Sequence, residues 1–181
     1  MLDPQSLYPS VVPRSYLTEL GYESCSYAGL GPNLVVMLWH DLSSAFRSVS
    51  PVELSQIEMT EDAAWAVAMG NLSRELTEGR LQVGIGNFED GGKAAFLDGH
   101  WLASATIFHA GLYPWFRAEL GCAELCALVS ERDSAVIFAS DCSDLVREKA
   151  ELFISKAAQF SRKPFGRNFY RLEDDGPIHV L

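Results

Sequence analysis

Cysteine and histidine are the side chains of this chain best suited to bind a metal ion. Cys122 and Cys126 are separated by three residues, a spacing found in structural zinc sites. Such a site needs a second close pair. In the helix expected over residues 100–112, His100 and His109 lie nine residues apart and would point to opposite faces. We therefore expect core cysteines, no metal and no cofactor.

A hydrolase needs a nucleophile beside a base that activates it, and the chain has no Gly-x-Ser-x-Gly motif. His40-Asp41 is the nearest pair of a base and an orienting carboxylate, but adjacent strand residues point to opposite faces. We predict no catalytic residue from these patterns. The alternative is an enzyme whose site is assembled from dispersed groups around His40 and His109, with Cys25 and Asp98 as further candidates.

Acidic residues gather in two predicted turns. Glu89 and Asp90 precede two glycines in one turn, and Glu173, Asp174 and Asp175 form the other. Neither group has the spaced ligands of a calcium loop. Solvated acidic turns of this kind favour contact with a partner protein.

An aromatic cluster adds a sixth candidate for partner binding. Trp115 and Phe116 follow Tyr113 and Pro114, where the proline predicts a helix break. Burial in the core is the ordinary role of such residues. The alternative is that Trp115 is an exposed anchor, since Trp and Tyr are frequent at binding hot spots.

Hairpins that alternate with single helices must position these residues. The central hairpin joins two apolar runs, Leu125–Val129 and Ala135–Ala139, through a charged turn. This order predicts an α+β fold, with a largely antiparallel sheet and about three amphipathic helices packed on it. Further strands are expected at 33–41, 45–50, 80–88, 93–97, 168–173 and 177–181, and helices at 61–78, 100–112 and 141–161. The apolar stripes expected to face the sheet are Trp65, Met69, Leu72 and Leu76 in the first helix, and Val146, Ala150, Phe153, Ala157 and Phe160 in the third.

The chain is expected to form one main domain. Residues 1–32 are rich in proline and glycine, so we predict an irregular segment with a short helix from Pro13 to Leu20 that covers the core. Residues 33–181 are predicted to form a single α+β domain, because domains of this size are common.

Bulk composition narrows the range of partners. The net charge is -10, with 24 acidic residues against 14 Lys and Arg, which disfavours nucleic acid and favours a basic protein partner. The N-terminus lacks the basic start and apolar run of a signal peptide, and the apolar runs are too short to span a membrane. We expect a protein of the reducing cytosol. The oligomeric state is not indicated.

Between about residues 50 and 172, short motifs follow one another in a characteristic order. They are a helix ending near Asn71-Leu72, a helix start at Asp98-Gly99, an apolar strand running into Arg132-Asp133, a further apolar strand, and the closing Phe169-Tyr170-Arg171-Leu172. In this order the chain resembles a family of uncharacterised bacterial proteins, domain of unknown function 1444, although Ser130 stands where a proline is expected. The resemblance implies a cytosolic α+β fold and no established activity.

Two functions remain open on these grounds. The first is a small acidic cytosolic bacterial protein that acts by protein–protein binding, such as an immunity or inhibitor protein that neutralises a toxin. The second is the enzyme with a dispersed site around His40 and His109.

Overall fold

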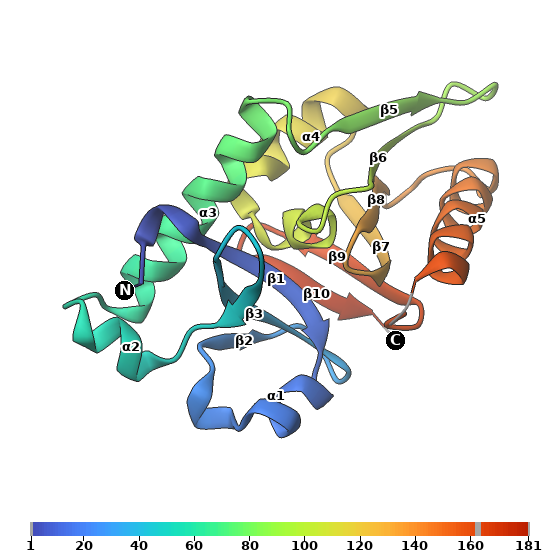
Figure 1. Cartoon of the computed structure of the whole chain (residues 1–181). Coiled ribbons are helices and arrows are strands. Elements are labelled where there is room, and N and C mark those ends of the chain that lie inside the picture. The colour runs from blue at the N-terminus through green and yellow to red at the C-terminus, as the bar shows by residue number, and fades with distance from the viewer. Residues whose placement is uncertain (1, 162–163, 181) are drawn as a thin grey trace. The chain divides into compact units, whose positions relative to one another are not determined.

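The computed structural model describes residues 2–161 and 164–180 (Figure 1). The chain forms two compact units, Met1–Arg80 and Leu81–Leu181, and each contains an antiparallel sheet with helices packed on it. The predicted α+β class is therefore confirmed. Among the helices of the described residues, none is long and apolar enough to cross a membrane.

The first unit is built around a small sheet of order β1-β3-β2, with β4 also paired to β3. Two of its helices begin at side-chain caps: the Ser50 and Thr60 hydroxyls accept hydrogen bonds from the amides three residues later, at the starts of α2 and α3. Its strands are β1 Leu7–Pro13, β2 Tyr27–Gly29, β3 Leu34–Asp41 and β4 Phe46–Ser48; its α-helices are α1 Ser15–Leu20, α2 Pro51–Gln56 and α3 Glu61–Thr77; its 3₁₀ turns are η1 Pro4–Ser6 and η2 Tyr22–Ser24.

The N-terminal segment is more regular than predicted. β1 pairs with β3 along its whole length, from Leu7 opposite His40 to Pro13 opposite Leu34. Prolines 9 and 13 are tolerated because β1 lies at the edge of its sheet and needs no outward amide donor. The expected irregular structure over these residues is wrong. The predicted domain boundary after residue 32 falls inside the first unit, between two paired strands.

The buried face of α3 agrees with the predicted stripe at Leu72, which is fully buried, and differs elsewhere. Buried positions include Ala64, Ala68 and the polar Asn71 and Glu75, whereas Trp65 is only partly buried. Small alanines allow close packing. The two polar residues are buried because each is paired: Asn71 Nδ2 donates to the Leu7 carbonyl at 2.8 Å, and the Tyr8 hydroxyl donates to Glu75 Oε1 at 3.1 Å.

The second unit contains a six-stranded antiparallel sheet of order β10-β9-β7-β8-β6-β5, made of the three predicted hairpins. Figure 1 shows α5 on one side of this sheet and α4 on the other. The strands are β5 Val83–Asn87, β6 Lys93–Asp98, β7 Leu125–Glu131, β8 Ser134–Ala139, β9 Asn168–Glu173 and β10 Gly176–Val180; the helices are η3 Ala103–Phe108, η4 Ala110–Leu112, α4 Tyr113–Leu120 and α5 Asp144–Phe160. Leu181, the end of the last predicted strand, lies outside the described residues.

α5 covers the centre of the sheet with a buried row that includes Val146, Ala150 and Ile154. The helix starts at Ser143, whose hydroxyl accepts a hydrogen bond from the Val146 amide at 3.3 Å. The predicted stripe is wrong at its end, because Phe160 is 87% exposed. Burial follows every fourth residue and stops at Ile154, so the last turn of the helix has no buried residue.

The helix predicted over residues 100–112 is absent, and the segment forms the two 3₁₀ turns η3 and η4 instead. All residues from Ala103 to Ile107 are buried, so the segment has no solvent face of the kind an amphipathic helix requires. The tighter turn is held by the Thr106 hydroxyl, which donates to the Ala103 carbonyl at 2.7 Å.

Candidate functional site

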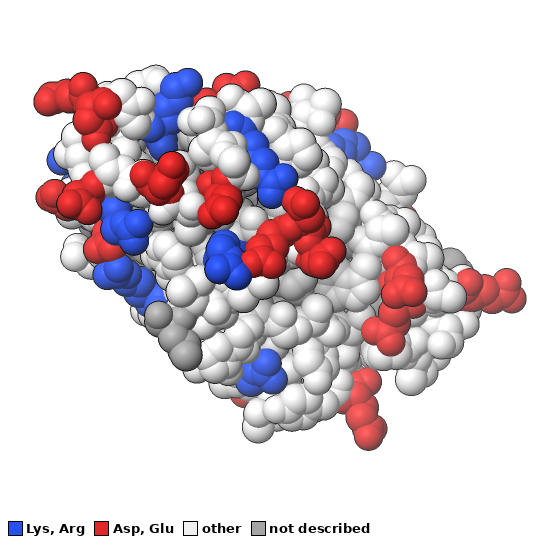
Figure 2. All heavy atoms as spheres, turned by 180° about the vertical axis from the view of Figure 1, so that it is seen from behind, with Lys and Arg blue, Asp and Glu red and all other residues white. Residues whose placement is uncertain are grey.

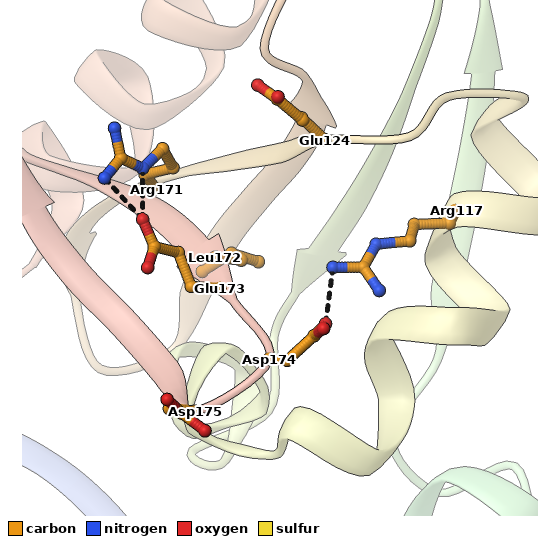
Figure 3. A pocket seen from close by; sticks show the side chains of 7 residues that line it. All are labelled: Arg117, Glu124, Arg171, Leu172, Glu173, Asp174 and Asp175. Atoms are coloured by element: carbon orange, nitrogen blue, oxygen red, sulfur yellow. Dashed lines mark hydrogen bonds and ion pairs between the residues drawn. The ribbon is translucent and has the colours of Figure 1, made fainter.

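A pocket of about 480 Å³ in the second unit contains one of the two predicted acidic turns. It lies between α4, the residue before β7 and the β9–β10 hairpin (Figure 3). Its lining residues are Arg117, Glu124, Arg171, Leu172, Glu173, Asp174 and Asp175.

Local sequence explains how the pocket is built. Asp174 and Asp175 form a two-residue turn that closes the hairpin before Gly176, whose φ of 129° is rarely adopted by other residues. Leu172 is buried and anchors the hairpin to the sheet. On the opposite side, α4 has Pro114 in its first turn and ends at Gly121, whose backbone is left-handed.

Two of the four carboxylates in the pocket are neutralised by arginines. Arg117 donates to Asp174 Oδ1 at 2.9 Å, and Arg171 Nε donates to Glu173 Oε1 at 2.7 Å. Figure 3 shows Arg117 reaching from α4 toward the turn, while Arg171 folds onto its neighbour along the hairpin. Both pairs are open to solvent, so each contributes little to stability.

The other two carboxylates have no ion pair with any described residue. Glu124 accepts a hydrogen bond from the Ser140 hydroxyl at 3.0 Å, and Asp175 is exposed at the tip of the turn. Figure 3 shows these two side chains at opposite ends of the pocket. The pocket therefore carries excess negative charge and can accept a cationic group without breaking an existing pair.

The second acidic turn, at Glu89 and Asp90, serves a different purpose. Asp90 accepts hydrogen bonds from the Ser143 hydroxyl and from the Gly92 amide, the latter at 3.0 Å. These two bonds hold the pKa of the Asp90 carboxyl below its usual value. Asp90 thus ties the β5–β6 turn to the start of α5, while Glu89 is exposed.

Trp115 does not line the pocket, although it lies on α4 two residues from Arg117. Two residues correspond to about 200° around a helix, so the two side chains leave α4 on nearly opposite sides. The Trp115 ring is 44% exposed and meets Phe116 edge to face, with centroids 4.9 Å apart. Of the six residues predicted to bind a partner, three line the pocket.

The candidate groups of the alternative enzyme do not form a described site. His40 and Cys25 belong to the first unit, and His109 and Asp98 belong to the second. His40 is buried, and its Nε2 accepts a hydrogen bond from the Asp3 amide at 3.3 Å. Burial, and secondly the positive charge of Arg47, lower the pKa of His40. The ring is therefore neutral and used in packing.

The thiols and potential metal ligands give no sign of reactive chemistry. Cys25 and Cys126 are buried, as expected for core cysteines, and Cys122 and Cys142 are partly buried. Burial raises the pKa of all four thiols, which keeps them protonated. Within residues 2–161 and 164–180, no three Cys, His, Asp or Glu side chains form a group that could hold a metal ion.

Sequence reasoning missed Arg117, Glu124 and Arg171 as pocket residues. Arg117 and Asp174 are 57 residues apart, and only the tertiary fold brings them together. Arg171 had a local signal, because it stands two residues before Glu173 in a strand and therefore shares its face.

Charge is mixed over the surface. Figure 2 shows acidic side chains beside basic ones in several places on the face it presents. The net charge of -10 therefore does not form one continuous negative surface on that face. For binding of a cation, local unpaired carboxylates matter more than the total charge.

Comparisons with family models, with curated proteins and with solved structures found no match. The resemblance to domain of unknown function 1444 stays a prediction.

Proposed function

We propose that this protein acts by binding another protein, and that a basic segment of the partner docks into the pocket at the β9–β10 turn. The observation that carries the proposal is the pair of unpaired carboxylates, Glu124 and Asp175, in a cavity of about 480 Å³. A Lys or Arg side chain of the partner would find a carboxylate at either end of the cavity. Arg117 and Arg171 would repel a cationic group of the partner that lies beside them instead of beside Glu124 or Asp175. This repulsion adds specificity.

The biological role that best suits this chemistry is that of an immunity or inhibitor protein that neutralises a basic toxin. Net charge of opposite sign speeds the encounter of two such proteins. We place the encounter in the bacterial cytosol, where the four unpaired thiols would stay reduced.

The test is an affinity capture of the tagged protein from its native cytosol at low and high salt, followed by binding measurements with the captured partner. A basic partner, bound in stoichiometric amount and released as salt rises, is expected. The double substitution Glu124→Gln and Asp175→Asn should weaken its binding by about tenfold or more, as for two charge-assisted contacts.

The matched control is Asp133→Asn, which removes a charge from the β7–β8 turn, outside the pocket. It should leave the affinity for the captured partner within about twofold, apart from the small loss of long-range steering. Equal effects of the two changes would show that total charge matters and not the pocket, and that result would contradict the proposal.

A further inference from the structure

The two edges of the six-stranded sheet are protected to different degrees. At one edge, β10 contains Pro177, which lies opposite Leu172. Because the two-residue turn makes Glu173 and Gly176 a hydrogen-bonded pair, the next pair is not hydrogen bonded, and the proline nitrogen faces outward. The proline removes a donor that an added strand would need.

The other edge, β5, has no such protection. The Phe88 amide donates to the Gly92 carbonyl at 2.9 Å, and the register with β6 is regular from there on. Hydrogen-bonded pairs alternate in an antiparallel ladder, so Gly86 and Gly84 bond to β6. Val83, Ile85 and Asn87 consequently direct their N–H and C=O groups away from the sheet.

No described residue takes up these outward groups. β5 contains no proline, no charged residue and no bulge, which are the usual means of blocking an edge strand. At Gly86 the Phe96 ring of the neighbouring strand lies 2.7 Å from where a Cβ would be, so that ring covers this position of β5. The edge is thus a row of three residues ready to pair.

We propose that β5 is a second docking surface, which accepts an extended segment of a partner protein as an added antiparallel strand. Val83 and Ile85 are half-buried, so the partner residues opposite them are apolar. The exposed Glu89 lies two residues after the end of β5, and the N-terminal end of an antiparallel segment would lie near it. The segment therefore carries Lys or Arg at that end. The nearby Lys93 does not compete, because its Nζ donates to the Glu119 carbonyl at 3.2 Å.

This surface is separate from the pocket at the β9–β10 turn and does not depend on it. The sheet order places the two at opposite edges of the sheet, with β6, β7, β8 and β9 between β5 and β10. A partner could use either surface alone, and substitutions at one leave the other intact.

The test is a titration of the full chain with an acetylated seven-residue peptide, Lys-Lys-Thr-Val-Thr-Val-Thr. Binding is followed by NMR, through the amide chemical shifts of the protein. Saturable shifts are expected at Val83, Ile85 and Asn87. The valines would bond to β5 and the threonines would face away. N-methylation of both valines should weaken binding about tenfold, because it removes the amides that bond to β5. N-methylation of the two threonines that follow the valines should change binding about twofold or less, because their amides face away from β5.

Substitution of the chain gives an independent readout. Glu89→Lys should weaken binding of the lysine peptide by about fivefold, and the matched change Asp133→Lys in the β7–β8 turn, which belongs to neither proposed surface, should not. Either no shifts at β5, or equal losses for both methylated peptides, would overturn the proposal. Sedimentation of the free chain tests a different occupant. If the chain is a dimer and Ile85→Pro dissociates it, then β5 binds a second copy of the chain and not a partner segment, which would contradict the proposal.

Discussion

The two acidic turns of the second unit look alike in sequence and differ in structure. In the β5–β6 turn, Asp90 is bonded to Ser143 and Gly92 and fastens the hairpin to α5. In the β9–β10 turn, the exposed Asp174 is paired with the partly buried Arg117, and Asp175 has no ion pair with any described residue. One turn uses its acid to hold the fold, and the other presents acid to solvent.

The difference shows what decides whether a charged turn is available for binding. The β5–β6 turn lies against the start of α5, where Asp90 accepts a hydrogen bond from the hydroxyl of the capping residue Ser143. The β9–β10 turn lies against the side of α4, where Arg117 pairs with Asp174 and leaves Asp175 without an ion pair to any described residue. Composition is therefore a weaker guide to binding than the donors that lie within reach of each carboxylate.

The largest effect that follows from this comparison concerns Gly92. A Cβ at this position would lie 2.4 Å from Val146 Cγ2, so Gly92→Ala must push the turn away from α5. We expect a loss of about 1–3 kcal/mol in the free energy of unfolding, as for other overpacked sites, measured by urea denaturation.

A double-mutant cycle with Val146→Ala checks the cause. If the steric contact is responsible, the second substitution removes the methyl group that clashes, and Gly92→Ala becomes less costly in that background. Additive effects of the two changes would show that the turn is not packed on α5 as described.

The sequence predicted those parts of the fold that depend on neighbouring residues. The three hairpins and the helices expected at 61–78 and 141–161 depend on turn residues and apolar spacing within a few residues, and each is present. β1 was missed because its prolines indicate irregular chain unless the strand is known to lie at an edge.

Features that depend on distant residues could not be predicted in this way. Glu75 is buried on α3 because its carboxylate is paired with Arg80, five residues later, and also accepts a hydrogen bond from Tyr8, 67 residues earlier. Only the second of these partners is distant in sequence. In the pocket, the acidic turn was identified from composition, but its unpaired state follows from where α4 and the residue before β7 lie. A pattern of single residues contains no information about such partners.

The second effect is the pH dependence of the stability that Asp90 contributes in the β5–β6 turn. Hydrogen bonds to its charged form lower the pKa of Asp90 in the folded state below the ordinary value of 3.8. Its contribution to stability is therefore fully present above pH 3.8 and is lost as pH falls through the folded value. Asp90→Asn should destabilise the protein at neutral pH, by less than Gly92→Ala.

The measurement is thermal unfolding of the wild type and Asp90→Asn from neutral to strongly acidic pH. The gap between the two melting temperatures should narrow as the wild-type carboxyl becomes protonated. A gap that is the same at both ends of the pH range would mean that the Asp90 charge is not what holds the turn to Ser143.

The smallest effect is expected at Asp174, the matched acid of the other turn. Its side chain is 85% exposed and that of Arg117 is 29% exposed, so solvent screens the pair between them. Asp174→Asn should change the free energy of unfolding by no more than about 0.5 kcal/mol, within the range of exposed ion pairs. It also frees Arg117 inside the pocket, which should weaken binding of a basic partner through repulsion. A loss of stability as large as that of Asp90→Asn would mean that both turns hold the fold, and the pocket would then have fewer acids available for a partner.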